Sequence, residues 1–242
     1  MSVFVSAAEL NERIQTGQKQ TIIAALWEPK DGKAWSKFQS EHIPTALYCD
    51  PSVQLAGLPG RAVGRNPLPS IDVVRKAAAG WGIEDGRPVY IYDGGNGLFA
   101  ARAWWILRWA GVRDVHILDG GFATWDGEGF PTVAGPGGIV VPRGVELTEG
   151  NLPSATMEDV RAFDGLLIDA RGARRFQGLR EILDLRAGHI PGARNLPVND
   201  LFDPESHKVK DTDTIRDRFS QLGVTQNTDP ASVITYSGSG NH

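Results

Sequence analysis

Residues 89–97 read VYIYDGGNG, and residues 233–241 repeat their pattern as VITYSGSGN. Each stretch joins four β-branched or aromatic residues to a glycine-rich turn. A second matching pair precedes them, with HIPTA at residues 42–46 and HIPGA at residues 189–193. Two separate matches at nearly the same spacing along the chain indicate a tandem duplication of one domain.

Short strand-like runs alternate with helical segments in each half. The expected strands cover residues 21–26, 89–92, 115–118, 166–168 and 233–236. Residues 98–110, LFAARAWWILRWA, contain neither Gly nor Pro and end before Gly111, which predicts a helix. The alternation predicts an α/β fold of two tandem domains, each a parallel sheet with helices on both faces.

A break rich in Gly and Pro, PTVAGPGGIVVPRG at residues 131–144, has no helical periodicity and predicts a linker. We therefore expect a first domain at residues 1–131, a linker at residues 132–144 and a second domain at residues 145–242. The first domain continues beyond its glycine-rich turn with a further helix and strand, whereas the sequence stops at His242, next to the matching turn. The second domain is therefore expected to be truncated, without its last helix and strand.

Composition excludes several classes of protein. The chain has 242 residues, and its 25 Lys and Arg against 29 Asp and Glu give a net charge of −4, which argues against a nucleic-acid or membrane-surface binder. No signal peptide or run long enough to span a bilayer is evident. The single cysteine, Cys49, excludes an internal disulfide and favours a cytoplasmic location. The five histidines have no metal-ligand spacing, so no metal site is expected.

The turn SGSGNH at residues 237–242 follows an expected strand and precedes the position of a helix. Backbone amides of such a turn point into one concavity, and a helix N-terminus adds positive potential, so anions, thiolates and persulfides are stabilised there. Taken alone, a plain tight connection is the commoner explanation. The turn is not a nucleophile elbow, and the chain has neither a P-loop nor a dinucleotide-binding motif.

Several motifs occur together in one known family. They are His42-Ile43-Pro44, GRNPLP at residues 64–69, ARAWW at 101–105, VHILDGG at 115–121, IDAR at 168–171, Arg175-Phe176, AGHIPGA at 187–193 and the terminal turn. Over essentially its whole length the chain resembles the two-domain rhodanese-type sulfurtransferases of the thiosulfate and 3-mercaptopyruvate sulfurtransferase group. The resemblance implies two similar α/β domains, a small anionic sulfur donor, a thiol or cyanide acceptor, and no cofactor.

The resemblance also implies which position carries the chemistry. The family's first domain is usually non-catalytic, and here its turn begins with Asp93. The second domain carries a CGSGxT-like turn whose cysteine accepts a sulfane sulfur as a persulfide and passes it to cyanide or a thiol. Aligned on Gly238-Ser239-Gly240, that position is Ser237. A serine hydroxyl without an adjacent base is a poor nucleophile, so this form is expected to bind donor-like anions without turnover.

Alternative explanations of Ser237 stay open. An engineered Cys→Ser form of an active enzyme is favoured, because the rest of the turn is intact; a natural protein without catalysis is the other origin. The alternative function from a different class is a non-catalytic rhodanese-like module that binds an anion or a partner. A phosphatase-like enzyme shares such a turn when an arginine follows it, but the tandem arrangement argues against that function.

Family members hold the carboxylate of mercaptopyruvate or the sulfonate end of thiosulfate with arginines of the second domain. Arg175, which precedes Phe176, matches the first of them, and a guanidinium suits a planar carboxylate. A solvated surface charge is the alternative. Arg186 is the second candidate, with Arg180 as its alternative, because the segment before GHIPG lacks the family's prolines.

Other residues complete the expected site. Ser239 and His42 are candidates for a hydrogen-bonded set near the nucleophile, with Asp31 as a looser addition, although His42 is equally expected to tie its own turn. The remaining turn residues are expected to face the substrate: Gly238, Gly240, Asn241 and His242. The last two leave the preferred donor open. Cys49 is expected to be a small buried residue rather than the sulfur carrier.

Overall fold

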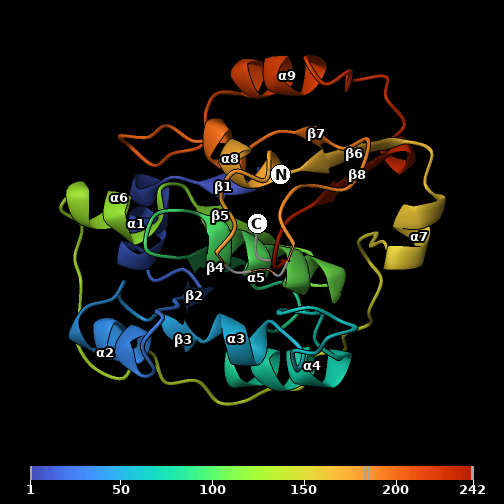
Figure 1. Ribbon diagram of the computed structural model, residues 1–242. Helices are drawn as coiled ribbons and strands as arrows, with labels where there is room; N and C mark the ends of the chain where they lie inside the picture. Colours follow the sequence, from blue (N-terminus) through green and yellow to red (C-terminus); the bar gives the residue numbers. More distant parts are fainter. Residues whose placement is uncertain (1, 183, 185, 241–242) are drawn as a thin grey trace. The chain divides into compact units, whose positions relative to one another are not determined.

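The structure is a computed structural model that describes residues 2–182, 184 and 186–240. It divides into two compact units, one ending at Pro153 and one spanning Ser154–Gly240. The elements of the first unit are β1 (Phe4–Val5), α1 (Ala7–Gln15), β2 (Thr21–Ala25), α2 (Lys33–Ser40), β3 (Leu47–Cys49), α3 (Pro51–Gln54), α4 (Ile71–Gly80), β4 (Val89–Tyr92), α5 (Leu98–Trp109), β5 (Val115–Leu118) and α6 (Gly121–Gly127) (Figure 1).

Five parallel strands in the order β1-β5-β4-β2-β3 form the sheet of the first unit. The central strands β2 and β4 pair from Thr21 opposite Val89 to Ala24 opposite Tyr92. Parallel neighbours require crossover connections, which the intervening helices supply. The α/β class predicted from the strand runs is confirmed.

Two separate clusters of buried side chains mark the two faces of this sheet. Successive strand residues point to opposite faces, and Ile23 belongs to the cluster that includes Ile106 of α5. Its neighbour Ile22 belongs to the other cluster, with Leu10 of α1 and Trp125 of α6. Helices therefore cover both faces of the first sheet, as expected.

The glycine- and proline-rich segment packs on the first unit. Val133 exchanges two backbone hydrogen bonds of 2.9 Å with His42. Leu147 lies beyond the expected linker, yet it is only 4% exposed and belongs to the core of the first unit. The division between the units therefore falls after Pro153, rather than within residues 132–144.

The second unit contains a three-stranded parallel sheet in the order β7-β6-β8. Its elements are α7 (Met157–Ala162), β6 (Leu166–Asp169), α8 (Ala173–Phe176), β7 (Arg194–Asn195), the 3-10 helix η1 (Val198–Leu201), α9 (Thr212–Ser220), the 3-10 helix η2 (Pro230–Ser232) and β8 (Val233–Tyr236). β6 pairs with β8 from Leu166 opposite Val233 to Asp169 opposite Tyr236. This order corresponds to β3-β2-β4 of the first unit.

The histidines of the two HIP segments make the same contacts in their respective units. The His42 ring stacks on Phe38 with 4.1 Å between centroids, and its Nδ1 lies 2.7 Å from the Phe38 carbonyl oxygen. The His189 ring stacks on Phe176 at 3.7 Å, and its Nδ1 lies 2.7 Å from the Phe176 carbonyl oxygen.

The residue after each histidine is also held in the same way. The Tyr92 hydroxyl accepts a hydrogen bond from Ile43 N at 3.3 Å, and the Tyr236 hydroxyl accepts one from Ile190 N at 3.2 Å. In both units the end of a central strand therefore fixes the HIP turn.

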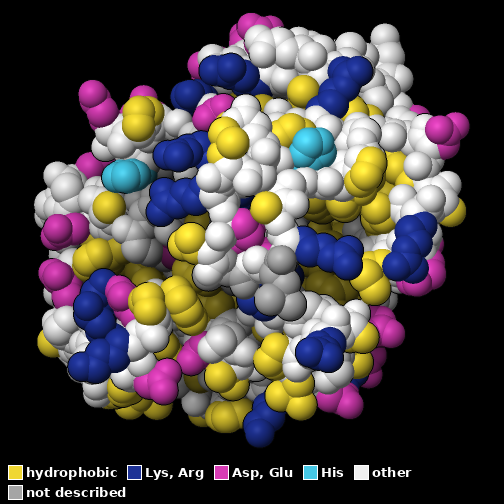
Figure 2. All heavy atoms as spheres, in the orientation of Figure 1, with side chains coloured by type: hydrophobic (Ala, Val, Ile, Leu, Met, Phe, Trp, Pro, Cys, Tyr) yellow, Lys and Arg dark blue, Asp and Glu magenta, His cyan; other side chains and the backbone are white. Residues whose placement is uncertain are grey.

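Charged side chains of both signs are interspersed among neutral and hydrophobic ones on the face drawn in Figure 2, in keeping with the small net charge of the chain. Among the helices of the described residues, none combines the length and apolarity that crossing a bilayer would demand.

The turn after β4 is organised around a buried carboxylate. Asp93 is 2% exposed. Its Oδ1 accepts hydrogen bonds from Gly95 N at 2.9 Å and Gly97 N at 3.1 Å, and its Oδ2 accepts from Phe99 N at 3.1 Å and Ala100 N at 3.3 Å. Burial raises the pKa of Asp93, while these four amides pull it down. The carboxylate thus satisfies the amides of the turn and of the first residues of α5.

Asp93→Ala is expected to destabilise the first unit by about 3 kcal/mol, because several buried amides lose their acceptor. Urea unfolding followed by tryptophan fluorescence measures this, since all seven tryptophans precede residue 131. Asp85→Ala, at an exposed position of the same unit, is the matched control and should change little. Equal unfolding midpoints for the two variants would contradict the structural role given to Asp93.

Candidate active site

The turn that follows β8 carries the predicted nucleophile position. The carboxyl ends of parallel strands meet at one edge of a sheet, where α/β proteins bind their ligands. Ser237 directly follows β8, and its Oγ accepts a hydrogen bond from Gly240 N at 3.0 Å. Gly240 has a φ of 81°, a left-handed conformation that glycine adopts without strain. The hydroxyl is therefore held against the backbone of its own turn.

The guanidinium of Arg175 lies against this turn. Arg175 belongs to α8, the short helix that follows β6. A Cβ atom placed on Gly238 would lie 3.1 Å from both Nη1 and Nη2 of Arg175, and 3.3 Å from Cδ of Arg171. Any side chain at position 238 would have to push these groups aside. The structure therefore brings Arg175 next to the residue that follows Ser237.

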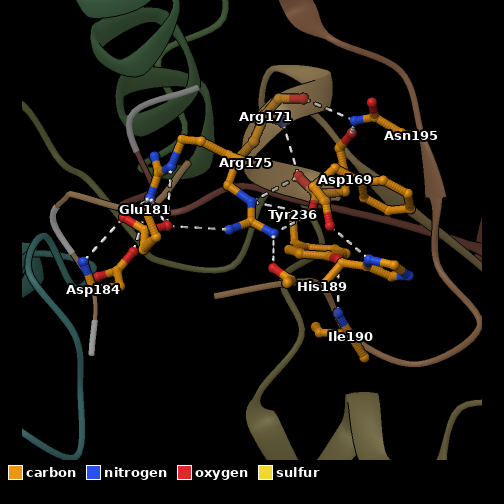
Figure 3. Close-up of polar contacts among 11 residues, drawn as sticks. Asp169, Arg171, Arg175, Glu181, Asp184, His189, Ile190, Asn195 and Tyr236 are labelled. Carbon is orange, nitrogen blue, oxygen red and sulfur yellow. Dashed lines mark hydrogen bonds and ion pairs between the residues drawn. The ribbon is translucent and has the colours of Figure 1, made fainter. Parts of the chain in front are cut away.

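Two carboxylates hold the Arg175 guanidinium (Figure 3). Glu181 accepts from Nε at 3.2 Å and from Nη2 at 2.9 Å, and Asp184 accepts from Nη2 at 2.9 Å. The side chain of Glu181 is 5% exposed and that of Asp184 is 35% exposed. Arg175 is therefore an ion-paired group and not the solvated surface charge of the alternative.

A second ion pair lies beside the first. Asp169 is fully buried at the end of β6 and accepts from Nε of Arg171 at 3.0 Å and from Nη2 at 2.7 Å. Nη2 of Arg171 also donates to the Gly188 carbonyl at 2.7 Å. Burial by itself would raise the pKa of the Asp169 carboxyl, but hydrogen bonds from Arg171 and Tyr236 outweigh it, and the pKa lies below its ordinary value.

The two pairs are joined, because Nη1 of Arg171 lies 3.9 Å from Oε2 of Glu181. Asp169, Arg171, Glu181, Arg175 and Asp184 therefore form one row of alternating charges, called the ion-pair network below. The network joins the end of β6 to the turn at Ser237. It also rests on Gly188 of the GHIPG segment.

The other predicted substrate-binding residues lie in more open surroundings. Arg186 and Arg180 are exposed, and within residues 2–182, 184 and 186–240 no hydrogen bond or ion pair of either guanidinium is found. Ser239 is half-buried in the turn. Asn241 and His242 lie outside the described residues. The role of each stays a prediction.

His42 belongs to the first unit and is 2% exposed. Its hydrogen bond and ring stacking on Phe38 match those of His189 on Phe176, as expected of a residue that ties its own turn. Its proposed part in a hydrogen-bonded set near the nucleophile stays a prediction, as does that of Asp31, an exposed residue of the first unit.

Burial and grouping bear on whether Cys49 and the described histidines form further sites. Cys49 is fully buried in β3, and burial raises the pKa of its thiol well above the ordinary value. Since sulfur transfer requires an accessible thiolate, Cys49 is a small buried residue, as predicted. In the described part of the chain, no group of three or more His, Cys, Asp or Glu side chains is arranged to hold a metal ion.

A family model described as a rhodanese-like domain matches residues 6–128, about half of the chain. Known relatives extend the match across both units. A protein of Pseudomonas aeruginosa, named "Probable 3-mercaptopyruvate sulfurtransferase", is 35% identical over 224 residues, which cover 89% of this chain and 76% of the relative. The chain belongs to the rhodanese-type sulfurtransferase family.

Other rhodanese-type proteins match nearly the whole chain. The 3-mercaptopyruvate sulfurtransferase of Escherichia coli K12 is 32% identical over 257 residues, covering 98% of this chain and 84% of the relative. The crystal structure of SseA from Escherichia coli, presented with the rhodanese fold and catalytic mechanism of 3-mercaptopyruvate sulfotransferases, superposes with a TM-score of 0.81 at 30% identity. It covers 97% of this chain and 88% of SseA.

Sequence reasoning on this rhodanese-type chain missed four members of the ion-pair network. Asp169 and Arg171 lie within the IDAR motif, and Glu181 and Asp184 within the segment before GHIPG, but none was given a role. A carboxylate and an arginine two residues apart at the end of a buried strand were the available signal for the first pair. Nothing local in the sequence indicated that Glu181 and Asp184 reach Arg175.

Asp169→Asn is expected to destabilise the second unit by about 3 kcal/mol at pH 7, because Arg171 loses its buried anionic partner. The lowered pKa of Asp169 means that the wild-type carboxylate stabilises above its unfolded-state pKa of about 3.9, and that this stability is lost as the pH falls through the lower folded pKa. The difference between the proteins should therefore shrink below about pH 4.

Hydrogen–deuterium exchange of peptides from β6 and β8 measures this change. Tryptophan fluorescence does not report on the second unit, since its residues include no tryptophan. Asp217→Asn on α9, an exposed residue, removes the same charge and is the control. Unchanged protection of β6 in Asp169→Asn would show that the pair contributes no net stability.

Proposed function

We propose that this protein is built to move a sulfane sulfur from a small anionic donor, 3-mercaptopyruvate or thiosulfate, to a thiol or cyanide through a persulfide at position 237. With Ser237 at that position, this form binds the donor and does not turn it over. The observation that carries the proposal is the Arg175 guanidinium lying against Gly238, beside the turn where the family has its nucleophile. The relatives' names support the same substrate class.

The chemistry requires a thiolate at this position. A cysteine thiolate attacks the sulfane sulfur of thiosulfate, the S–S bond breaks, and sulfite leaves with the electron pair. Cyanide then attacks the terminal sulfur of the persulfide, forming thiocyanate and restoring the thiolate. A serine hydroxyl is a far weaker acid than a thiol and a poor nucleophile unless a base accepts its proton, so neither step is expected to begin at Ser237.

The chain's own residues would orient the donor. A guanidinium binds a carboxylate or sulfonate through paired N–H donors, and that of Arg175 lies against Gly238. Arg186 is proposed as a second anion-binding group. Gly238, Ser239 and Gly240, together with Asn241 and His242, would complete the turn around the reacting sulfur.

We also propose that the two units are tandem copies of one domain in a cytoplasmic protein, the first copy being non-catalytic. The matching strand orders and the repeated contacts of His42 and His189 support a duplication. Asp93 occupies the position equivalent to Ser237 and uses its carboxylate to bind its own turn. The single buried Cys49 accords with a reducing compartment.

A rhodanese-like binding module is the second candidate function, and Ser237 itself favours it. The Oγ atom accepts a hydrogen bond from Gly240 N, so the turn is satisfied without a thiolate. Such a module would bind an anion or a partner at the same turn and need no nucleophile.

Ser237→Cys is expected to create activity where the parent has none, because a thiolate is then presented at the turn. Thiocyanate formed from thiosulfate and cyanide, and pyruvate formed from 3-mercaptopyruvate, are the two readouts. Mass spectrometry of the variant after donor treatment should show the gain of one sulfur atom at residue 237.

Two further variants separate the candidate functions. Ser237→Ala should stay inactive, and Arg175→Ala in the Ser237→Cys background should lower kcat/KM by at least about tenfold, because a charge-assisted contact with the donor is lost. If Ser237→Cys binds thiosulfate but gains no sulfur and forms no product, the binding module is the correct function.

A further inference from the structure

Part of the Arg175 guanidinium is already occupied by anions of the chain itself. Nη2 of Arg175 donates to Oδ2 of Asp184 at 2.9 Å as well as to Glu181. A donor carboxylate or sulfonate that binds through Nη2 must share or take over these positions. The sequence segment before GHIPG thus supplies a competitor for the ligand.

The two carboxylates are not equally exchangeable. Glu181 is 5% exposed, contacts both Nε and Nη2 of Arg175, and accepts a hydrogen bond from the backbone N of Asp184 at 3.0 Å. Asp184 is 35% exposed and reaches Arg175 through Nη2. Water and solutes reach Asp184, whereas Glu181 is fixed inside the network. Asp184 is therefore the carboxylate that a ligand can displace.

The net charge of the ion-pair network opposes the binding of an external anion. Asp169, Glu181 and Asp184 outnumber Arg171 and Arg175, so the network carries one excess negative charge. Without Asp184 the remaining four groups balance. An anion that approaches Nη2 of Arg175 therefore meets repulsion from the exposed carboxylate of Asp184.

We propose that Asp184 is a specificity-determining residue that competes with the donor anion for Nη2 of Arg175 and disfavours dianionic donors relative to monoanionic ones. The inference rests on the proposed function, in which Arg175 holds the donor. Coulomb repulsion scales with ligand charge, so Asp184 weakens the binding of a dianion such as thiosulfate more than that of a monoanion such as pyruvate. Glu181 keeps the guanidinium in place when Asp184 is displaced.

Asp184→Asn is the direct test, because it keeps the size of the side chain and removes its charge. Isothermal titration calorimetry with pyruvate and with thiosulfate measures the dissociation constants. The Ser237 form suits this measurement, since no turnover is expected to accompany binding. If removal of one charge tightens monoanion binding about threefold, the same interaction acting on two ligand charges tightens dianion binding by about the square of that factor, roughly tenfold.

Matched variants give the comparison its controls. Asp184→Glu retains the charge and should keep the parent's preference between the two ligands. Asp217→Asn removes an equal charge from an exposed position on α9, outside the ion-pair network, and should leave both dissociation constants unchanged. Arg175→Ala should weaken binding of both ligands by at least about tenfold.

The outcomes separate the inference from the proposed function. If Arg175→Ala weakens binding but Asp184→Asn changes both ligands equally or not at all, Asp184 is not a specificity determinant and the role of Arg175 stands. If Arg175→Ala leaves binding unchanged, Arg175 does not hold the donor and the proposed site is wrong. If no variant binds either ligand, both proposals are overturned.

Discussion

A guanidinium can lie directly on a turn only where the turn has no side chain to keep it away. Gly238 meets this constraint, since a Cβ atom there would come within 3.1 Å of two nitrogens of Arg175. The close approach of this positive charge to residue 238 therefore depends on the absence of a side chain there. A Cβ atom at residue 238 would force the guanidinium or the turn to give way by a few tenths of an ångström.

The ion-pair network explains how Arg175 keeps this position. An arginine on a four-residue helix has little local structure to hold it, and an isolated surface ion pair contributes little. Here Glu181 is nearly buried and accepts hydrogen bonds from Nε and Nη2 of the guanidinium, while Asp169 and Arg171 anchor the row to the end of β6. Placement of the charge thus comes from tertiary contacts with carboxylates that also partly neutralise it. If Arg175 holds the donor as proposed, these contacts lower the affinity for it, and the exposed carboxylate of Asp184 is the one that a donor would displace.

The parts of the fold that were predictable are those set by local pattern. The strand runs at residues 89–92, 115–118 and 233–236 were assigned with the bounds that the structure has, because continuous apolar or β-branched runs between turn signals are typical of buried parallel strands. The end of the first unit was not predictable in this way. Gly and Pro show where the backbone is irregular, but they do not show that Leu147 reaches back into the first core.

The same distinction applies to the candidate site. Ser237, Gly238 and Arg175 were singled out by motif, and the structure places them side by side. Glu181 and Asp184 were invisible as site residues because the segment between Arg175 and His189 departs from the family's prolines. The position of such a segment depends on the ion pairs that its carboxylates form. Those pairs cannot be predicted without the positions of Arg171 and Arg175 in the folded unit.

The two glycine-rich turns occupy equivalent positions after β4 and β8 but begin with different residues, Asp93 and Ser237. In the first unit, Asp93 sends a carboxylate into the turn and satisfies four amides with its two oxygens. A turn that holds its own anion has no amide left in that set for a ligand. In the second unit a short hydroxyl at Ser237 accepts a hydrogen bond from Gly240 N, and no Asp or Glu occurs at residues 237–240. In the proposed function, the anion beside this turn is instead the carboxylate of Asp184 on Arg175, which a donor would replace. Under that proposal, the difference between Asp93 and Ser237 is what leaves the second turn open to an external anion.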